Sequence, residues 1–302
     1  MNTMMTLRGT RLYVEDHNPA AETVLLYLHG GPGASSVDFG YYQAGALAFH
    51  MRVIALDQRG VLRSDPLKAN EPFGLHDIIE DCEAIRIQLG IEQWYVLGHS
   101  FGAMVAFRYA LRYPESVTGV IFEGPCFDVR SSMRTLIRAA ATYYDSQRNR
   151  EKAGRCLDYL EGQYTAQELW HAWGEIGSAL GMRKDEIYFR GIQPESYHTL
   201  VDRIVPDSAM WEKNQQHVLK LEEEGMFFEN LIPELPALSQ PSILLTGRHD
   251  PVCNEEQRQA YLEAVPSGSV VLFERSGHFP RLEEPVKYTE EVVKFVIRQH
   301  NA

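Results

Sequence analysis

Residues 98–102 read Gly-His-Ser-Phe-Gly, with a serine two positions from a glycine on each side. This short segment separates an apolar run from an amphipathic one. Residues 94–97 are strand formers, and residues 103–113 carry apolar side chains at helical spacing. A Gly-x-Ser-x-Gly turn between a strand and a helix is typical of a nucleophile elbow, in which the glycines let the two elements approach closely. A chance match in a loop is the alternative, but the flanking strand and helix favour a reactive role for Ser100.

Strand-like runs alternate with helical patterns on both sides of this turn. Residues 6–15 suggest a short hairpin. Several of the later runs are continuously apolar, which suits strands buried on both faces of a parallel sheet. The pattern predicts an α/β fold with a mainly parallel central sheet flanked by helices. The expected strands are 23–28, 51–56, 94–97, 117–122, 242–246 and 269–273, and the expected helices are 75–89, 103–113, 255–265 and 285–299.

The alternation stops in the middle of the chain. Residues 126–235 are rich in Trp, Tyr, Arg and Glu, with helical patterns and few runs that resemble buried strands. We therefore expect a core formed by residues 1–125 and 236–302, with residues 126–235 as a helical cap. A chain of 302 residues is long enough for one large domain that carries such an insertion.

The charge balance narrows the classes of partner. The chain has 41 acidic and 29 basic residues and a formal net charge of −12, which argues against nucleic acid and anionic membrane surfaces. The opening residues show no secretory pattern, and no stretch approaches the ~20 apolar residues that cross a bilayer. The four cysteines are scattered, without a Cys-x-x-Cys pair. We expect a reduced, cytoplasmic protein.

Two polar residues that follow the last two expected strands could complete a catalytic group with Ser100. A serine hydroxyl needs a base to accept its proton, and the base needs a carboxylate to orient it. Asp250 and His278 stand in the order that this kind of elbow requires. Taken singly, Asp250 could be a turn or capping residue, and His278 a loop histidine. His249 is the rival base, but it adjoins the acid in sequence. The order and the strand-end positions favour Ser100, Asp250 and His278.

A tetrahedral intermediate on the serine needs hydrogen-bond donors for its oxyanion. One should be the backbone N–H of Phe101, directly after the nucleophile. The other should come from the turn at residues 29–33 (His-Gly-Gly-Pro-Gly), where Gly31 is our candidate because glycines keep side chains away from the amide. A simple tight loop is an adequate explanation for the other glycines of this turn.

Together these motifs resemble the α/β-hydrolase superfamily. The sequences His-Gly-Gly-Pro-Gly at 29–33, Asp-Gln-Arg-Gly at 57–60 and Gly-His-Ser-Phe-Gly at 98–102, with the later Asp250 and His278, most resemble its proline iminopeptidase branch. The resemblance covers roughly residues 20–125 and 240–300. It implies a serine peptidase that removes an N-terminal residue, typically proline, and a helical cap whose glutamates bind the free amine.

Three positions depart from the pattern of that branch. The elbow has His99 and Phe101 where Gly and Trp are usual, and residues 61–62 are Val-Leu where small residues and a second glycine are usual. In the cap, a Trp directly followed by Glu is often present. The nearest match is Trp-Gly-Glu at residues 173–175.

The candidates for substrate binding are therefore less clear than the triad. Glu175, beside Trp173, is the first candidate for binding the amine, followed by Glu195 and the glutamates at 222–224. A solvated helix face explains the 222–224 cluster better, and Trp173 could simply pack inside the cap. We add Trp173 and His99 as candidate substrate contacts.

The leading hypothesis is a serine aminopeptidase acting on a small peptide. A carboxylesterase, lactonase or amidase acting on a small acyl compound is the alternative, and a non-enzymatic ligand receptor on the same fold is a further one. Haloalkane dehalogenases and epoxide hydrolases are disfavoured because they need an aspartate at position 100. No His-x-x-x-His or cysteine cluster offers metal ligands, so we expect neither a metal nor another cofactor. The oligomeric state is left open.

Overall fold

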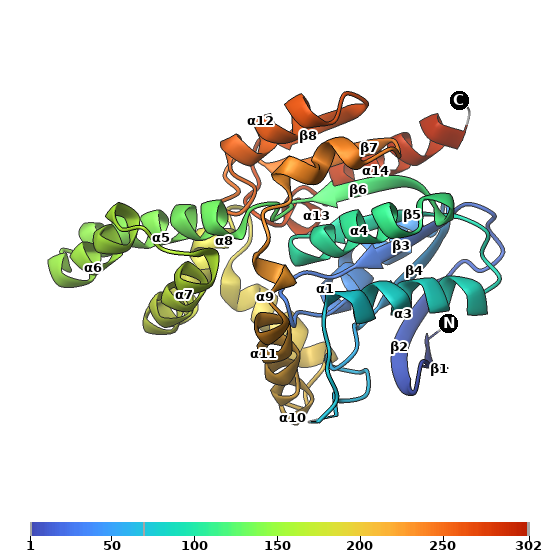
Figure 1. The fold of residues 1–302 in the computed structure, drawn as a ribbon, viewed down its shortest axis with the longest axis horizontal. Helices are drawn as coiled ribbons and strands as arrows, with labels where there is room; N and C mark the ends of the chain where they lie inside the picture. The colour runs from blue at the N-terminus through green and yellow to red at the C-terminus, as the bar shows by residue number, and fades with distance from the viewer. Residues whose placement is uncertain (1, 69, 301–302) are drawn as a thin grey trace.

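An eight-stranded sheet forms the centre of the computed structural model, which describes residues 2–68 and 70–300 (Figure 1). The strand order is β1-β2-β4-β3-β5-β6-β7-β8, with β1 and β2 antiparallel at one edge and the other strands parallel to one another. The predicted α/β class with a mainly parallel sheet is confirmed. The strands are β1 (Asn2–Leu7), β2 (Thr10–His17), β3 (Val24–Leu28), β4 (Arg52–Leu56), β5 (Trp94–His99), β6 (Val117–Glu123), β7 (Ser242–Gly247) and β8 (Gly268–Phe273).

The strands lie close to their predicted positions, because strands that are buried on both faces are visible in the sequence as apolar runs. Every residue of β3, β5 and β7 is buried, so a continuous apolar run marks each of them. The hairpin of β1 and β2 is longer than the predicted residues 6–15 and begins at Asn2. Backbone pairing with β2 extends β1 over residues 2–5 (Asn-Thr-Met-Met), of which Met5 alone is buried.

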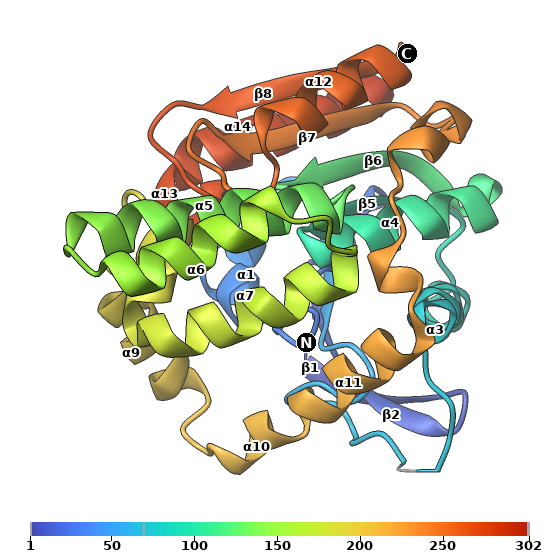
Figure 2. The same cartoon turned by 60° about the vertical axis from the view of Figure 1, so that its left-hand side comes forward.

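Helices cover both faces of the sheet (Figure 2). On one face, α3 (Leu75–Gln88), α4 (Phe101–Arg112) and α12 (Glu255–Ala264) pack on strand residues such as Leu26 and Val96. The opposite face is covered by α1 (Val37–Phe39), α2 (Gly45–Leu47) and α14 (Pro285–His300), which pack on the alternate strand residues. Shorter connecting turns are η1 (Gly40–Ala44), η2 (Pro114–Ser116) and α13 (Pro280–Glu283).

Between β6 and β7 the described chain is helical. We call residues 129–224 the helical insertion. Helix α5 packs against α6 and α7, and Figure 1 shows these three projecting away from the sheet. The insertion contains α5 (Val129–Ser146), α6 (Arg150–Glu161), α7 (Ala166–Leu180), η3 (Gly181–Lys184), α8 (Asp185–Tyr188), α9 (Pro194–Ile204), α10 (Ala209–Glu212) and α11 (Asn214–Glu224), and the turns η4 (Met226–Phe228) and η5 (Ile232–Ala237) lead back to β7. The division into domains at residues 126 and 235 stays a prediction. None of the helices in the described part of the chain has the length and apolar character needed to cross a lipid bilayer.

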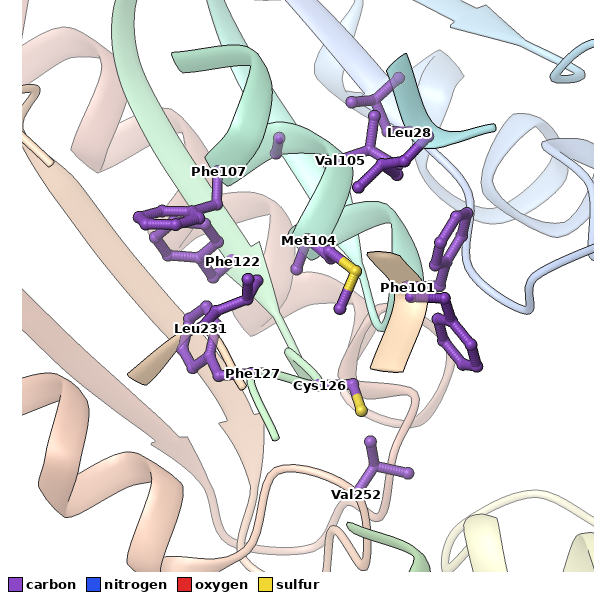
Figure 3. Close-up of a cluster of buried hydrophobic side chains, with 14 of the residues drawn as sticks. Leu28, Phe101, Met104, Val105, Phe107, Phe122, Cys126, Phe127, Leu231 and Val252 are labelled. Carbon is purple, nitrogen blue, oxygen red and sulfur yellow. The ribbon is translucent and has the colours of Figure 1, made fainter. Parts of the chain in front are cut away.

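The register of the parallel strands brings the segments that follow them to one edge of the sheet. Leu28 of β3 is opposite Gly98 of β5, and His99 is opposite Glu123 of β6. Beside this edge an apolar cluster joins Phe101 and Met104 of α4 to residues that follow β6 and β7 (Figure 3). In open parallel sheets this edge is where ligands bind.

Candidate active site

Ser100 occupies the sharp turn between β5 and α4. Its backbone has φ 53° and ψ −116°, a conformation that L-residues rarely adopt and that typically costs about 1–3 kcal/mol. The turn leaves no room for side chains on either flank, because a β-carbon at Gly98 would clash with the carbonyl of Gly102, and one at Gly102 with the carbonyl of Leu28. The N–H of Ser100 donates to the carbonyl of Glu123 at 2.9 Å, which ties the turn to the next strand. The two glycines of the motif are therefore sterically required.

Asp250 and His278 are in contact where β7 and β8 end. The Nδ1 of His278 lies 3.0 Å from Oδ1 of Asp250, and both side chains are almost completely buried. The same carboxylate accepts hydrogen bonds from the N–H groups of Val252 (2.8 Å) and Cys253 (3.1 Å) and from the hydroxyl of Thr246 (3.2 Å). With the carboxylate accepting from Nδ1–H, the Nε2 of His278 is left to act as a base.

The loop that carries His278 is bound to the helical insertion. The N–H of His278 donates to the carbonyl of Tyr188 at 2.8 Å. The carboxylate of Glu283 accepts from the N–H of Gly277 (2.7 Å) with one oxygen and from the N–H groups of Arg190 and Gly191 with the other. Residues 188–191 of the insertion and the histidine loop therefore form one hydrogen-bonded unit.

The turn after β3 lies directly beside the serine. A β-carbon at Gly30 would be 3.0 Å from the Cβ of Ser100, and Gly31 has φ +115°, which disfavours any residue with a side chain. His29 fixes the start of this turn, because its Nε2 accepts from the N–H of Gln58 and its carbonyl accepts from the Gln58 side chain, both at 3.0 Å. Within the described residues, the N–H groups of Gly31 and Phe101 donate to no protein acceptor, so both are available for an oxyanion.

These groups surround one cavity of about 730 Å³. Seven of the predicted site residues line it: Gly31, His99, Ser100, Phe101, Trp173, Glu175 and His278. Asp250 contacts it only through His278, and His249 is exposed and is not among the lining residues. The described residues show no hydrogen bond between the hydroxyl of Ser100 and His278. Such bonds are often long in unliganded enzymes and tighten when substrate binds.

His99 and Trp173 are both held within the walls of this cavity. The Nε2 of His99 lies 3.1 Å from the carbonyl of His278, and burial holds the pKa of His99 well below its ordinary value, so the ring is neutral. Trp173 is 4% exposed, and its indole N–H donates to the hydroxyl of Tyr188 at 3.0 Å. Both residues contribute to the shape of the cavity and already have hydrogen-bond partners within the protein.

Four carboxylates also line the cavity. Asp38 pairs with the buried Arg281 at 2.6 Å, and Asp185 lies 2.7 Å from His198. The side chain of Glu175 is 70% exposed, and its nearest cation is the guanidinium of Arg155 at 3.9 Å. The fourth carboxylate is Glu222.

Glu222 is the partly buried member of this group, with its side chain 15% exposed. It accepts a hydrogen bond from the indole N–H of Trp170 at 2.6 Å and lies 3.1 Å from Nε2 of His171, and no lysine or arginine of the described chain pairs with it. The interpretation of 222–224 as a solvated face is therefore wrong for Glu222, although Glu223 and Glu224 are exposed.

A series of aromatic contacts connects Glu222 to the turn at Ser100. The ring of Phe101 lies 5.6 Å from that of Phe227, and Phe227 lies 4.8 Å from Trp170, which donates to Glu222. All four residues line the cavity. The first of these contacts joins residues 126 positions apart and the other two join residues more than 50 positions apart, so no local sequence pattern marks them.

Comparison with known proteins agrees with this architecture. Residues 23–285 match the family described as the alpha/beta hydrolase fold. A proline iminopeptidase from Xylella fastidiosa (strain Temecula1 / ATCC 700964) is 36% identical over 294 residues, which cover 89% of this chain and 87% of that protein.

Two solved structures show the same fold. The proline iminopeptidase of Mycobacterium smegmatis superposes with a TM-score of 0.68 at 22% identity, covering 99% of this chain and 98% of the other. An esterase from Exiguobacterium antarcticum has a TM-score of 0.67 at 23% identity, covering 98% and 99%. The chain therefore belongs to the α/β-hydrolase fold family, in its proline iminopeptidase-like branch.

Proposed function

We propose that this hydrolase is a serine aminopeptidase that releases the N-terminal residue of short peptides, with proline as the first residue to test. The relative from Xylella fastidiosa, itself named a proline iminopeptidase, supports the substrate class. The strained turn at Ser100 and the contact between Asp250 and His278 support the chemistry.

In the proposed reaction, the Oγ of Ser100 attacks the carbonyl carbon of the N-terminal residue while the Nε2 of His278 takes the hydroxyl proton. The oxyanion accepts hydrogen bonds from the N–H groups of Gly31 and Phe101, and one such donor is commonly worth about 10²–10³ in kcat. His278 then gives its proton to the departing amine, which leaves an ester on Ser100. Water, activated by His278, hydrolyses that ester and frees the serine.

Glu222 is the observation that carries the choice of an aminopeptidase. An exopeptidase has to distinguish a free α-ammonium group from an internal amide, and a carboxylate screened from water does this well. Two opposite charges 4 Å apart attract by about 4 kcal/mol at an effective dielectric constant of about 20, against about 1 kcal/mol in water. Glu222 is 15% exposed, whereas Glu175 is 70% exposed. We therefore assign amine binding to Glu222 in preference to Glu175, the candidate favoured by sequence.

The existing partners of Glu222 fit this assignment. The hydrogen bond from Trp170 and the contact with His171 fix the carboxylate at the cavity wall without an arginine or lysine that would neutralise it. Asp38, in contrast, already has a guanidinium partner in Arg281. A substrate ammonium group would supply the positive charge that Glu222 lacks.

The test is a comparison of kcat/KM on two kinds of substrate, with two variants of equal charge change. Prolyl, alanyl and leucyl arylamides carry the free amine, and N-acetylated arylamides and short acyl esters do not. We expect Glu222→Gln to lower kcat/KM at least tenfold, or about 1.4 kcal/mol, on the free-amine substrates and to leave the others nearly unchanged. Glu175→Gln is the matched control and should change kcat/KM less than about twofold, since exposed charges are screened.

The alternative is a carboxylesterase, lactonase or amidase, and the apolar part of the cavity wall favours it. An uncharged acyl group would fit against side chains such as Met133, Leu136, Trp170, Phe227 and Val252. If wild-type protein hydrolyses short esters far faster than any free-amine arylamide, and Glu222→Gln affects both alike, the aminopeptidase assignment is rejected and the esterase is favoured.

A further inference from the structure

Asn214, the first residue of α11, connects the helical insertion to two loops of the core. Its side-chain Nδ2 donates to the carbonyl of Gly33 at 2.9 Å, and its Oδ1 accepts from the N–H of Leu62 at 2.8 Å. Asn214 is 7% exposed, so each bond is shielded from competing water. The amide side chain thus uses its donor and its acceptor on segments that are 181 and 152 residues away in sequence.

The first of these segments is the turn that carries Gly31. Gly33 has φ +81°, and a β-carbon there would be 2.9 Å from Cγ2 of Val218, one turn further along α11. The helix therefore lies against one end of the turn. The other end is fixed by His29 and Gln58, as described above. Gly31 lies between these two points of attachment.

The second segment contains Leu62, which stands where the proline iminopeptidase branch usually has a glycine. Leu62 has φ +38°, in the left-handed region, where a non-glycine residue costs roughly 1–3 kcal/mol. Its side chain is buried with Val37, Val61 and Val205, and Met210 and Trp211 of the insertion pack against this group. Asn214 holds the N–H of the strained residue, so the contact between Leu62 and the insertion and the bond to Gly33 depend on the same side chain.

The geometry points to Asn214 as a positioning residue for the oxyanion-binding turn. After Gly33 the next hydrogen bonds to the core are made by Ser36, whose N–H and hydroxyl both donate to Asp57 at 3.0 Å. Loss of the Asn214 bond would remove the hydrogen bond that holds Gly33 between His29 and Ser36, and would let the N–H of Gly31 leave its position. This inference rests on the proposed function in one respect, that Gly31 donates to the oxyanion. A displacement of about 1 Å in such a group can cost about 10²-fold in rate.

Lys213 provides the matched control. Its Nζ donates to the carbonyl of Ser64 at 2.6 Å, so it also connects the start of α11 to the core, but it has no hydrogen bond to the turn. Asn214→Asp is the second test variant, because a carboxylate can still accept from Leu62 but cannot donate to Gly33. It therefore separates the bond to the turn from the bond to Leu62.

The experiment measures kcat, KM and the affinity for a boronic acid that forms a tetrahedral adduct with the serine. The substrate is the best one from the panel above. We expect Asn214→Ala and Asn214→Asp to lower kcat and boronate affinity 10- to 100-fold, with KM changed less than threefold. Lys213→Ala should change all three quantities less than threefold, even if it lowers the melting temperature as much as the Asn214 substitutions do.

Two outcomes overturn the inference: a folded Asn214→Asp protein with wild-type kcat and boronate affinity, or equal losses in the Asn214 and Lys213 variants. Neither outcome would affect the assignment of Ser100 as the nucleophile. That assignment fails separately, if Ser100→Ala retains activity.

Discussion

Gly124 lies so close to His278 that a β-carbon at position 124 would be 2.9 Å from Nδ1 of the imidazole. The same β-carbon would be 2.8 Å from Oδ2 of Asp250, and Gly124 has φ +47°. The residue after β6 therefore limits the space in which Asp250 and His278 meet. No other residue type fits here without moving one of the two partners.

We expect Gly124→Ala to lower kcat about 10- to 100-fold, because the added methyl group pushes the imidazole or the carboxylate out of line. The loss should appear in kcat with every substrate. Gly154→Ala is the control: Gly154 lies in α6 with open space around its Cα, so alanine should leave kcat unchanged and stabilise the helix by about 0.5–1 kcal/mol. Wild-type kcat in Gly124→Ala would contradict the close fit.

Ser100→Ala should abolish labelling by a serine-directed organophosphonate and lower kcat by about 10⁴–10⁶. Mass spectrometry of the labelled protein locates the adduct. An adduct on another serine, or substantial activity in the variant, would refute the assignment of the nucleophile.

The strain at Ser100 predicts a second, thermodynamic result. Glycine adopts φ 53° without the penalty of about 1–3 kcal/mol, but it also has more freedom in the unfolded chain, which costs about 0.4–1 kcal/mol. Ser100→Gly should therefore be more stable than Ser100→Ala by about 1 kcal/mol in denaturant unfolding. A Ser100→Gly protein less stable than Ser100→Ala by about 0.4–1 kcal/mol would show that the turn stores no strain.

His278 and His249, the two candidates for the base, differ sharply in their surroundings. His278 is buried against Asp250, whereas His249 is exposed and does not line the cavity. We expect His278→Ala to lose activity on the scale of Ser100→Ala, and His249→Ala to keep at least half of the wild-type kcat. The reverse result would exchange their roles.

His217 predicts a pH dependence of stability. This residue of α11 is buried, and its Nδ1 lies 2.8 Å from the carbonyl of Arg59. Burial lowers the pKa of His217 to about 3, although the bond to Arg59 acts in the opposite direction. Between pH 6.5 and 3 the unfolded chain binds a proton at this histidine that the folded protein excludes. Stability is therefore lost as the pH falls below about 6.5, at about 1.4 kcal/mol per pH unit.

We expect His217→Gln, which keeps a hydrogen-bond donor, to lose about 2 kcal/mol less than wild type between pH 6.5 and pH 5. Urea unfolding at the two pH values measures the difference. Part of the slope remains in the variant, because burial also lowers the pKa values of His29 and His99. Identical slopes in the two proteins would show that His217 is protonated in the folded state.

The sheet could be predicted from sequence because its strands are buried on both faces. A fully buried strand such as β3 must be apolar at every position, and that run is visible without any knowledge of its neighbours. The elbow was also predictable, since its glycines are required by contacts within about five residues or with the adjacent strand. For the strands and for Gly98 the constraint lies within the local segment, whereas Gly102 is required by Leu28 of the adjacent strand.

The cavity wall was not predictable in the same way. A helix carrying three consecutive glutamates has the pattern of a solvated face, and Glu223 and Glu224 are indeed exposed. Glu222 is shielded only because Trp170 and His171, more than 50 residues earlier, lie over it. Long-range packing of this kind leaves no periodicity, so the proposed amine site could not be derived from the chain alone.

Hydrogen bonds from the insertion to the core have a consequence for how substrate enters. Tyr188 holds the backbone of His278, and Asn214 holds the turn beside Ser100. If the insertion lifted away as a rigid lid, it would take both loops with it, and the open form would have no functional active site. We therefore expect substrate and product to exchange through local movement at the cavity mouth, without lifting of the whole insertion. If the proposed function holds, turnover would then not require repeated assembly of the catalytic groups.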